Sequence, residues 1–222
     1  MKLVVIDGLD GSGKATQTAL VHEELTRRGI PSRIVSFPDY DSDSSALVKM
    51  YLRGDFGQSV TDVGAFAAST FYAVDRFASF KKDWEADYQA GTIILCDRYT
   101  TSNAVHQMAK LPEKQWDSFL SWLYDFEFVK MGIPAPSTVI YLDMSPAATE
   151  KLLAARYHGD ESKKDIHERD RKYMESSRRA AQFAAARDGW LTVNCCQGDT
   201  PLLPEEITKR IFEKLKGLDY SL

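Results

Sequence analysis

A glycine-rich stretch directly follows an apolar run at the N-terminus and limits the folds open to this chain. Residues 3–6 are Leu, Val, Val and Ile, a composition typical of a buried strand. The sequence GLDGSGK occupies residues 8–14, and apolar residues at helical spacing follow over 15–28. A strand, a glycine-rich turn and the start of a helix, in this order, predict a loop that binds phosphate.

Each part of this loop has a physical role. Glycines permit backbone conformations closed to other residues, so successive N–H groups can point into one concavity and bind phosphate oxygens. The start of the next helix adds partial positive charge, and Lys14 adds a full one. A glycine-rich turn without a ligand would not need the flanking strand and helix. The residues expected to bind phosphate are Gly8, Asp10, Gly11, Ser12, Gly13, Lys14, Ala15 and Thr16.

One position departs from the usual pattern of such loops. A Ser or Thr normally follows the lysine and supplies a hydroxyl ligand for Mg²⁺, but this chain has Ala15 there. Thr16 comes one residue late and, on a helix, points about 100° further round. The pattern therefore does not predict a Mg²⁺ ligand within the loop itself.

Length and composition predict one α/β domain over residues 1–222. The chain is 44% hydrophobic and 27% charged, and its net charge of −4 argues against nucleic acid as a partner. No apolar run approaches the ~20 residues of a membrane span, and the N-terminus lacks the pattern of a signal peptide. The three cysteines, Cys96, Cys195 and Cys196, match neither a disulfide framework nor a zinc site, so we expect a cytoplasmic protein.

Predicted strands and helices alternate along the chain. The strands are expected over 3–6, 32–37, 92–97, 138–142 and 191–193. The helices are expected over 15–28, 46–53, 63–88 (as one long helix or two broken ones), 113–131, 147–156, 166–187 and 204–215. This order predicts a five-stranded parallel sheet between two helical layers. Ligands of such sheets bind beyond the carboxyl ends of the strands. The glycine-rich loop, residues 38–40 and residues 97–98 all follow such ends, so they can face one cleft.

The third predicted strand ends in Asp97-Arg98-Tyr99. An acid at a strand end beside a phosphate loop commonly positions Mg²⁺ or its water ligands, so Asp97 is the expected metal residue. The planar guanidinium of Arg98 suits phosphate. The alternative is an ion pair at the surface.

Two further segments have both a functional and a structural interpretation. Asp75-Arg76 lies on an aromatic helical face with Tyr72, and an aromatic ring beside an arginine can bind a flat base. Such a face, taken alone, is more often core. Residues 156–171 are dense in charge, which is typical of a solvated helix start or of a lid over a transferring phosphate.

These pieces together resemble the thymidylate kinase family over most of the chain, from Leu3 to about Asp199. The matching motifs are GLDGSGKATQ at residues 8–17, FPDY at 37–40, YAVDR at 72–76, DRY at 97–99 with Ser102-Asn103, and an acidic pair at 165 and 168. The resemblance implies a P-loop kinase fold of three α/β/α layers with a short lid at about 156–171. It also implies a homodimer, for which the aromatic helix over 66–80 is the expected face.

The resemblance also implies roles for single residues. Asp10 would contact the sugar 3′-hydroxyl of dTMP, and Tyr40 and Arg98 would hold its phosphate. Tyr72 would stack on thymine, Arg76 would bind its O4 atom, and Asn103 would also touch the base. The full set expected at dTMP is Asp10, Phe37, Tyr40, Tyr72, Arg76, Arg98, Asn103, His106, Asp165 and Glu168. His106 stands where many members carry a tyrosine close to the sugar C2′ atom.

The donor side follows from the same resemblance. Residues 196–199 would lie against the adenine of ATP. Members without an arginine in the phosphate loop carry basic residues in the lid, and here Arg156, Lys163 and Lys164 are the candidates. The groups expected to act in transfer are Asp10, Lys14, Arg98 and Arg156.

The function expected is therefore a nucleoside monophosphate kinase that transfers the γ-phosphoryl group of ATP to dTMP with Mg²⁺. One alternative is a kinase for another nucleoside or deoxynucleoside monophosphate. The other is a P-loop ATPase switch, which would need no second base pocket such as Tyr72 and Arg76 imply.

Overall fold

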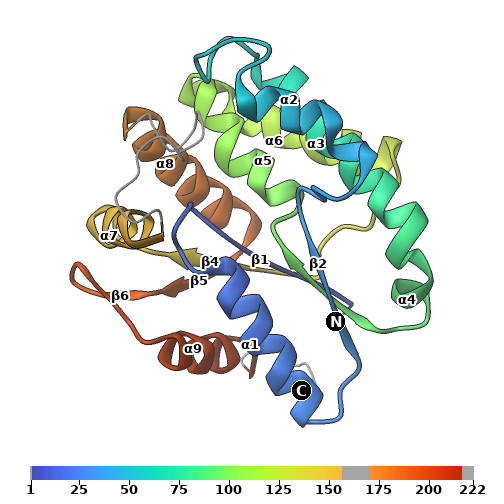
Figure 1. Ribbon diagram of the computed structural model, residues 1–222, viewed down its shortest axis with the longest axis vertical. Coiled ribbons are helices and arrows are strands. Elements are labelled where there is room, and N and C mark those ends of the chain that lie inside the picture. Colours follow the sequence, from blue (N-terminus) through green and yellow to red (C-terminus); the bar gives the residue numbers. More distant parts are fainter. Residues whose placement is uncertain (1, 157–170, 217–222) are drawn as a thin grey trace.

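The computed structural model describes residues 2–156 and 171–216 (Figure 1). In this part of the chain, five parallel strands form one sheet in the order β2-β3-β1-β4-β5. The strands are β1 (Leu3–Gly8), β2 (Ser32–Ser36), β3 (Ile93–Asp97), β4 (Thr138–Asp143) and β5 (Leu191–Asn194). The five-stranded parallel sheet expected from the sequence is confirmed.

Strand β1 is the centre of this sheet. All six of its residues are buried, and it pairs with β3 on one side and β4 on the other. Ile6 lies opposite Asp97 and Ile140. Because neighbouring strands run in the same direction, their carboxyl ends meet at one edge, where the glycine-rich loop and Asp97 also lie.

Helices make up most of the remaining structure. They are α1 (Lys14–Arg27), α2 (Ala46–Arg53), α3 (Ala65–Ser79), α4 (Glu85–Gln89), α5 (Thr100–His106), α6 (Trp116–Tyr124), α7 (Pro146–Arg156), α8 (Arg171–Asp188) and α9 (Pro204–Lys216). A short antiparallel hairpin of β6 (Cys196–Gln197) and β7 (Thr200–Pro201) follows β5.

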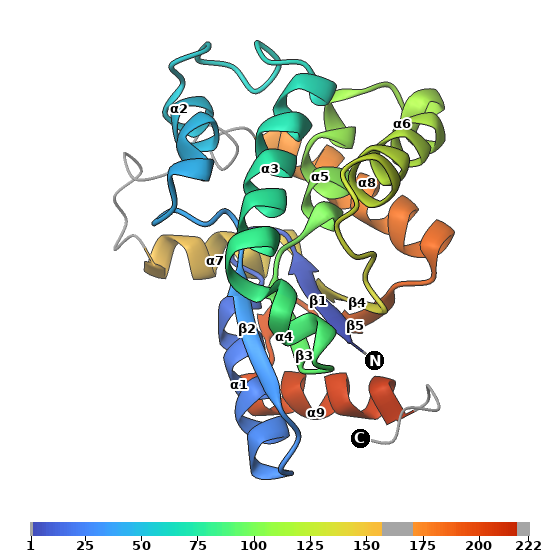
Figure 2. The same ribbon diagram turned by 90° about the vertical axis from the view of Figure 1, so that its right-hand side faces the viewer.

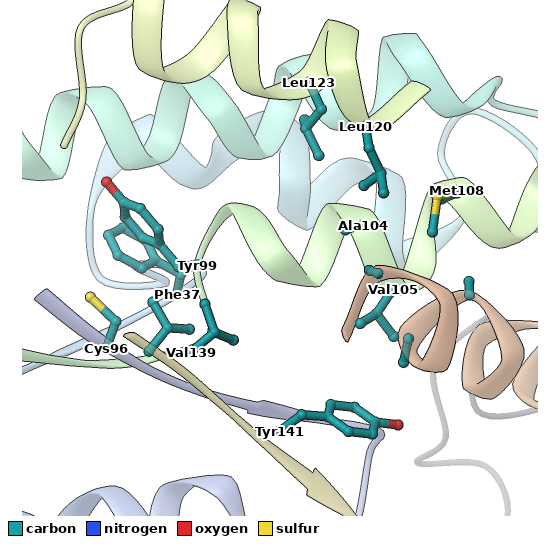
Figure 3. Packing of buried hydrophobic residues seen from close by; sticks show 14 of the residues in the cluster. Phe37, Cys96, Tyr99, Ala104, Val105, Met108, Leu120, Leu123, Val139 and Tyr141 are labelled. Atoms are coloured by element: carbon teal, nitrogen blue, oxygen red, sulfur yellow. The ribbon is translucent and has the colours of Figure 1, made fainter. Parts of the chain in front are cut away.

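The helices form two layers, one on each face of the sheet (Figures 1 and 2). On one face, Val21 and Leu25 of α1 and Ile211 of α9 pack against Val4 and Ile6 of β1. On the other face, α3, α5, α6 and α8 cover a larger core. Figure 3 shows part of it, with Tyr99 and Phe37 at one end and Met108 and Leu120 at the other. The three-layer α/β/α fold is therefore confirmed.

Two predicted helices contain turns of π-helix. The helix expected over 63–88 begins at Ala65 and passes through a π-helical segment, Phe80–Trp84, before α4. The helix expected over 113–131 consists of a 3₁₀ turn, α6 and the π-helical segment Asp125–Lys130. Such segments have one extra residue in a turn and are common at functional sites.

Helix α5 and the β6–β7 hairpin were not predicted from the sequence. Helix α5 begins with Thr100, Thr101, Ser102 and Asn103, residue types of modest helix propensity. Tertiary contacts stabilise it instead, because Thr101 Oγ1 donates to Asp7 Oδ2 at 2.5 Å and Ser102 Oγ to the same atom at 2.9 Å. A membrane-spanning helix was not expected, and no helix among the described residues is long and apolar enough to be one.

Close packing at the end of β1 predicts that a side chain at Gly8 destabilises the protein. A Cβ atom at Gly8 would lie 2.9 Å from the Leu142 carbonyl oxygen, whereas one at Gly29 would contact nothing within 4 Å. We expect Gly8→Ala to lower the free energy of unfolding by about 3 kcal/mol. Gly29→Ala should cost about 1 kcal/mol, from its positive φ alone. Urea unfolding of both variants tests this, and equal losses would contradict the packing described here.

Candidate functional site

The glycine-rich loop has the backbone geometry expected of a phosphate-binding loop. Gly11 and Gly13 have φ values of 78° and 84°, in the left-handed region that glycine adopts without strain. Gly13 is the N-cap of α1, and Lys14 is the first residue of that helix. The helix N-terminus therefore adjoins the loop, where it favours an anion. Ala15 and Thr16 are exposed on the first turn.

Lys14 is buried within this loop. Its Nζ atom donates hydrogen bonds to the carbonyl oxygens of Gly8 and Leu9, each at 2.9 Å, and lies 3.9 Å from Asp10 Oδ1. Burial, followed by the nearby charge of Arg98, lowers the pKa of Lys14 from 10.5 to about 8. The amine therefore loses its proton far more easily than an exposed lysine does.

Arg98 connects the end of β3 to the loop. Its backbone N–H donates to the Ile6 carbonyl oxygen at 3.1 Å, and its φ of 67° turns the chain there. The guanidinium forms an ion pair with Asp10, and its Nη1 atom lies 3.4 Å from His106 Nε2. Burial alone would lower the pKa of Arg98, but the carboxylates of Asp10, Asp7 and Asp97 outweigh it and raise that pKa.

Asp97 carries an oxygen that the described protein atoms do not satisfy. Its Oδ1 atom is buried and has no hydrogen-bond partner among the described residues. Burial raises the pKa of this carboxyl group, although Lys14 and Arg98 oppose the shift. A buried, unsatisfied carboxylate oxygen beside a phosphate loop fits a role near a cation or its water ligands.

A cleft opens beside the loop. Its walls come from the loop, the segment after β2, helices α2, α3 and α5, and the end of β3. It is lined by Asp10, Phe37, Pro38, Tyr40, Leu52, Tyr72, Arg76, Arg98, Tyr99, Ser102, Asn103, His106 and Gln107. The structure thus brings together eight residues expected at dTMP, namely Asp10, Phe37, Tyr40, Tyr72, Arg76, Arg98, Asn103 and His106.

The remaining predicted residues belong to the expected lid. Asp165 and Glu168, with the candidate cations Lys163 and Lys164, lie outside the described residues. Arg156 is the last residue of α7, and its side chain is also outside the described part of the structure. Their roles stay predictions.

Five further residues line the cleft and were not among the predicted site residues. Pro38, Tyr99 and Ser102 adjoin predicted site residues, so their motifs already pointed to them. Gln107 lies four residues after Asn103, and prediction of α5 would have placed both on one helical face. Leu52 had no distinguishing signal in the sequence.

Two adjacent charged residues of α3 organise the wall that carries Tyr72. Asp75 accepts hydrogen bonds from the Asp39 backbone N–H at 2.9 Å and from Ser44 Oγ at 2.6 Å. It thereby fixes the segment that contains Tyr40. Burial raises the pKa of Asp75, and these two hydrogen bonds oppose the shift. Arg76 is 1% exposed and forms a two-pronged ion pair with the buried Glu127.

The hairpin at residues 196–201 lies close to the start of α7, because the Ser145 backbone N–H is 3.4 Å from Cys196 Sγ. Helix α7 also reaches the loop: a Cβ atom added at Gly11 would lie 3.1 Å from Leu153 and 3.3 Å from Thr149. The segment expected at adenine therefore lies on the α7 side of the phosphate loop.

Comparison with known proteins gives a consistent result. A family model described as "Thymidylate kinase" matches residues 6–207. The chain is 27% identical to the thymidylate kinase of Mycobacterium tuberculosis, with 85% of this chain and 87% of that protein covered. It is 29% identical to that of Caenorhabditis elegans, with 98% and 91% covered. A thymidylate kinase structure from Candida albicans has a similar fold, with a TM-score of 0.71, 19% identity, and 97% of this chain and 91% of that chain covered.

The lowered pKa of Lys14 predicts a proton linked to nucleotide binding. At about pH 9 the free amine is mostly neutral, since its pKa is about 8. Phosphate favours the charged form and raises the pKa, so binding of ATP should take up close to one proton at that pH. It should take up far fewer at about pH 6.5, where the amine is already charged.

Calorimetry in two buffers of different ionisation enthalpy measures this uptake. The affinity for ATP should also weaken as the pH rises above about 8. Lys14→Met should abolish the uptake, because it keeps an apolar stem and removes the amine. Equal uptake by wild type and Lys14→Met would show that another group titrates.

Proposed function

Since the chain belongs to the thymidylate kinase family and its reaction is transfer of the ATP γ-phosphoryl group to dTMP, we propose that the cleft beside the loop holds dTMP. The observation that carries this assignment is the convergence of eight predicted residues on one cleft. They come from separate segments between Asp10 and His106, and Asp10 belongs to the phosphate loop as well.

The base is proposed to lie between α3 and α5. Tyr72 supplies a ring for stacking, and Arg76 and Asn103 supply polar groups beside it. Thymine carries an acceptor, O4, where cytosine carries an amino donor. Arginine only donates, so Arg76 suits thymine or uracil. His106 lies near Arg98, and we propose that it faces the sugar.

The phosphate of dTMP is proposed to lie at the loop end of the cleft. Arg98 and Tyr40 bind its oxygens, and Phe37 supports this wall through its ring contact with Tyr99, 5.8 Å between centroids. Asp10, already paired with Arg98, accepts from the sugar 3′-hydroxyl. The guanidinium of Arg98 suits phosphate binding because it can donate two parallel hydrogen bonds to phosphate oxygens.

The triphosphate of ATP is proposed to bind on the loop from Gly8 to Thr16, with its adenine towards residues 196–199. Transfer of a phosphoryl group needs alignment and charge neutralisation more than covalent participation by the protein. Lys14 and Arg98 supply positive charge from the loop and from β3. We propose that residues 156–171 act as a lid within a single domain of residues 1–222. Its cations, Arg156, Lys163 and Lys164, are proposed to add further charge, and its acids, Asp165 and Glu168, are proposed to act on the acceptor side.

Magnesium fits this site as an ion held mainly by substrate. No group of three potential protein ligands exists among residues 2–156 and 171–216, and Ala15 offers no hydroxyl. Mg²⁺ bound to ATP usually keeps several waters and has few protein ligands. The unsatisfied Asp97 oxygen can accept a hydrogen bond from one of these waters or bind the ion directly. The ion would neutralise charge on the phosphates.

A homodimer is proposed through α3. Phe66, Val74 and Phe77 are 46%, 42% and 39% exposed and fall within about 80° of arc on the helix. An apolar stripe of this kind is typical of a protein interface. A cytoplasmic location is also proposed, because all three cysteines are free thiols.

An acceptor panel tests the assignment of function. An unmatched buried polar group costs about 1–3 kcal/mol, so kcat/KM for dTMP should exceed that for dCMP by about 5- to 150-fold. The measurement is ADP release with dTMP, dUMP, dCMP and no acceptor; dUMP is the matched control, since it keeps O4 and lacks only the methyl group. Equal values for dTMP and dCMP would contradict the assignment of Arg76. ADP release that needs no acceptor would favour an ATPase switch.

Light scattering tests the proposed dimer. The wild type should have about twice the mass of the 25.0 kDa chain. Phe77→Glu should be a monomer, because formation of the dimer would bury the charge of the glutamate. Leu203→Glu is the control: Leu203 is 65% exposed and precedes α9, on the other side of the sheet. A monomeric wild type, or dissociation by both variants, would contradict the α3 interface.

A further inference from the structure

A buried carboxylate lies directly behind two residues of the base site. Glu127 belongs to the π-helical segment Asp125–Lys130 and is fully buried. Its Oε1 atom accepts hydrogen bonds from Arg76 Nη2 at 2.6 Å and from Asn103 Nδ2 at 3.2 Å. Its Oε2 atom accepts from Arg76 Nε at 2.7 Å and from Thr100 Oγ1 at 2.7 Å. One side chain thus joins α3, α5 and the segment after α6.

The hydrogen-bonding capacity of Glu127 is fully used by these four donors. Each carboxylate oxygen has two lone pairs and two donors, so no acceptor remains for a ligand. Within the described part of the chain, Arg76 and Asn103 line the cleft and Glu127 lies behind them. Glu127 therefore acts on a bound base only through these two neighbours.

The first effect concerns Arg76. The two-pronged contact with Nε and Nη2 fixes the plane of the guanidinium. It leaves Nη1, 3.5 Å from the Tyr99 carbonyl oxygen, as the nitrogen that Glu127 does not engage. Burial would lower the pKa of Arg76, but the charge and hydrogen bonds of Glu127 outweigh it and raise that pKa. Arg76 is therefore a charged donor with a fixed orientation at the wall of the cleft.

The second effect concerns the amide of Asn103. An amide group has a donor end and an acceptor end, and its neighbours decide which way it faces. Glu127 Oε1 and the Ser69 carbonyl oxygen both lie 3.2 Å from Nδ2, and both can only accept. The nitrogen must therefore face them, which turns the acceptor atom Oδ1 away from them.

Stability alone does not explain this arrangement. A buried ion pair is often no more stabilising than apolar residues of the same volume, because both charges lose their hydration. Trp116, Leu120 and Leu123, on the same helical stripe as Glu127, are all buried apolar residues. Glu127, at the next position of this stripe, interrupts an otherwise apolar contact. This indicates that its role is to orient Arg76 and Asn103.

We propose that Glu127 is a positioning residue that sets which base the enzyme accepts. It presents Arg76 as a donor and Asn103 as an acceptor, and this pair matches O4 and N3–H of thymine or uracil. Cytosine has the reverse pattern, an amino group and an unprotonated N3. The proposal rests on the proposed binding of the base in this cleft.

Glu127→Gln tests the proposal, since it keeps the shape but replaces one acceptor by a donor. We expect the dTMP-to-dCMP ratio of kcat/KM to fall roughly tenfold or more, mainly through a higher KM for dTMP. The KM for ATP should stay within about twofold. The ratio does not depend on how much enzyme is folded, so a purely structural role would leave it unchanged.

Two further variants keep the test decisive. Thr100→Val removes one donor to Glu127 without changing the Arg76 or Asn103 side chain. The carboxylate of Glu127 is then held less firmly and orients Arg76 and Asn103 less well, so the ratio should fall by a smaller factor than in Glu127→Gln. This variant also provides the test if Glu127→Gln does not fold. Ile211→Ala, in the core on the opposite face of the sheet, is the control for lost stability. It should leave the ratio unchanged.

The outcomes separate this proposal from the proposed function. A wild type without preference for dTMP over dCMP would overturn the base site itself. A wild type with that preference, retained in full by folded Glu127→Gln, would overturn only the role of Glu127. If Glu127→Gln does not fold, an unchanged ratio in Thr100→Val would equally overturn the proposed role of Glu127.

Discussion

The parallel pairing of β1 with β3 is the interaction on which the site depends. It places Asp97 opposite Ile6, at the point where β1 enters the phosphate loop. The Arg98 N–H extends the pairing by one hydrogen bond to Ile6, and the left-handed backbone of Arg98 then turns its guanidinium onto Asp10. Two strands that are about ninety residues apart in sequence thus supply charges to one small volume.

Asp7, on β1, fixes the wall of the cleft relative to the sheet. Its buried carboxylate accepts from the Gly8 backbone N–H at 2.8 Å and from the hydroxyls of Thr101 and Ser102. These bonds fix the start of α5, the helix that carries Asn103 and His106. The other wall, α3, is fixed to α5 through Glu127. The cleft therefore has rigid sides whose positions follow from the sheet, as preorganised binding requires.

Much of this structure could be predicted from the sequence. The parts that could not be predicted have one cause in common. Buried parallel strands are continuous apolar runs, so residues 3–6 and 93–96 were recognisable by composition. Helix α5 was not, because hydroxyl contacts to Asp7 stabilise it and they depend on a strand far away in sequence. The same holds for Glu127, whose partner Arg76 is 51 residues distant. Its only local signal is an acid on an apolar helical stripe, a pattern that does not name the partner.

We propose that two nucleotides meet in this site and that the phosphoryl group passes directly between them. The most direct test follows the γ-phosphorus of labelled ATP in the presence of Mg²⁺ and dTMP. We expect the label to appear in dTDP, with little inorganic phosphate, and this transfer to stop when dTMP is left out. Label released as inorganic phosphate at the same rate with and without dTMP would contradict this proposal.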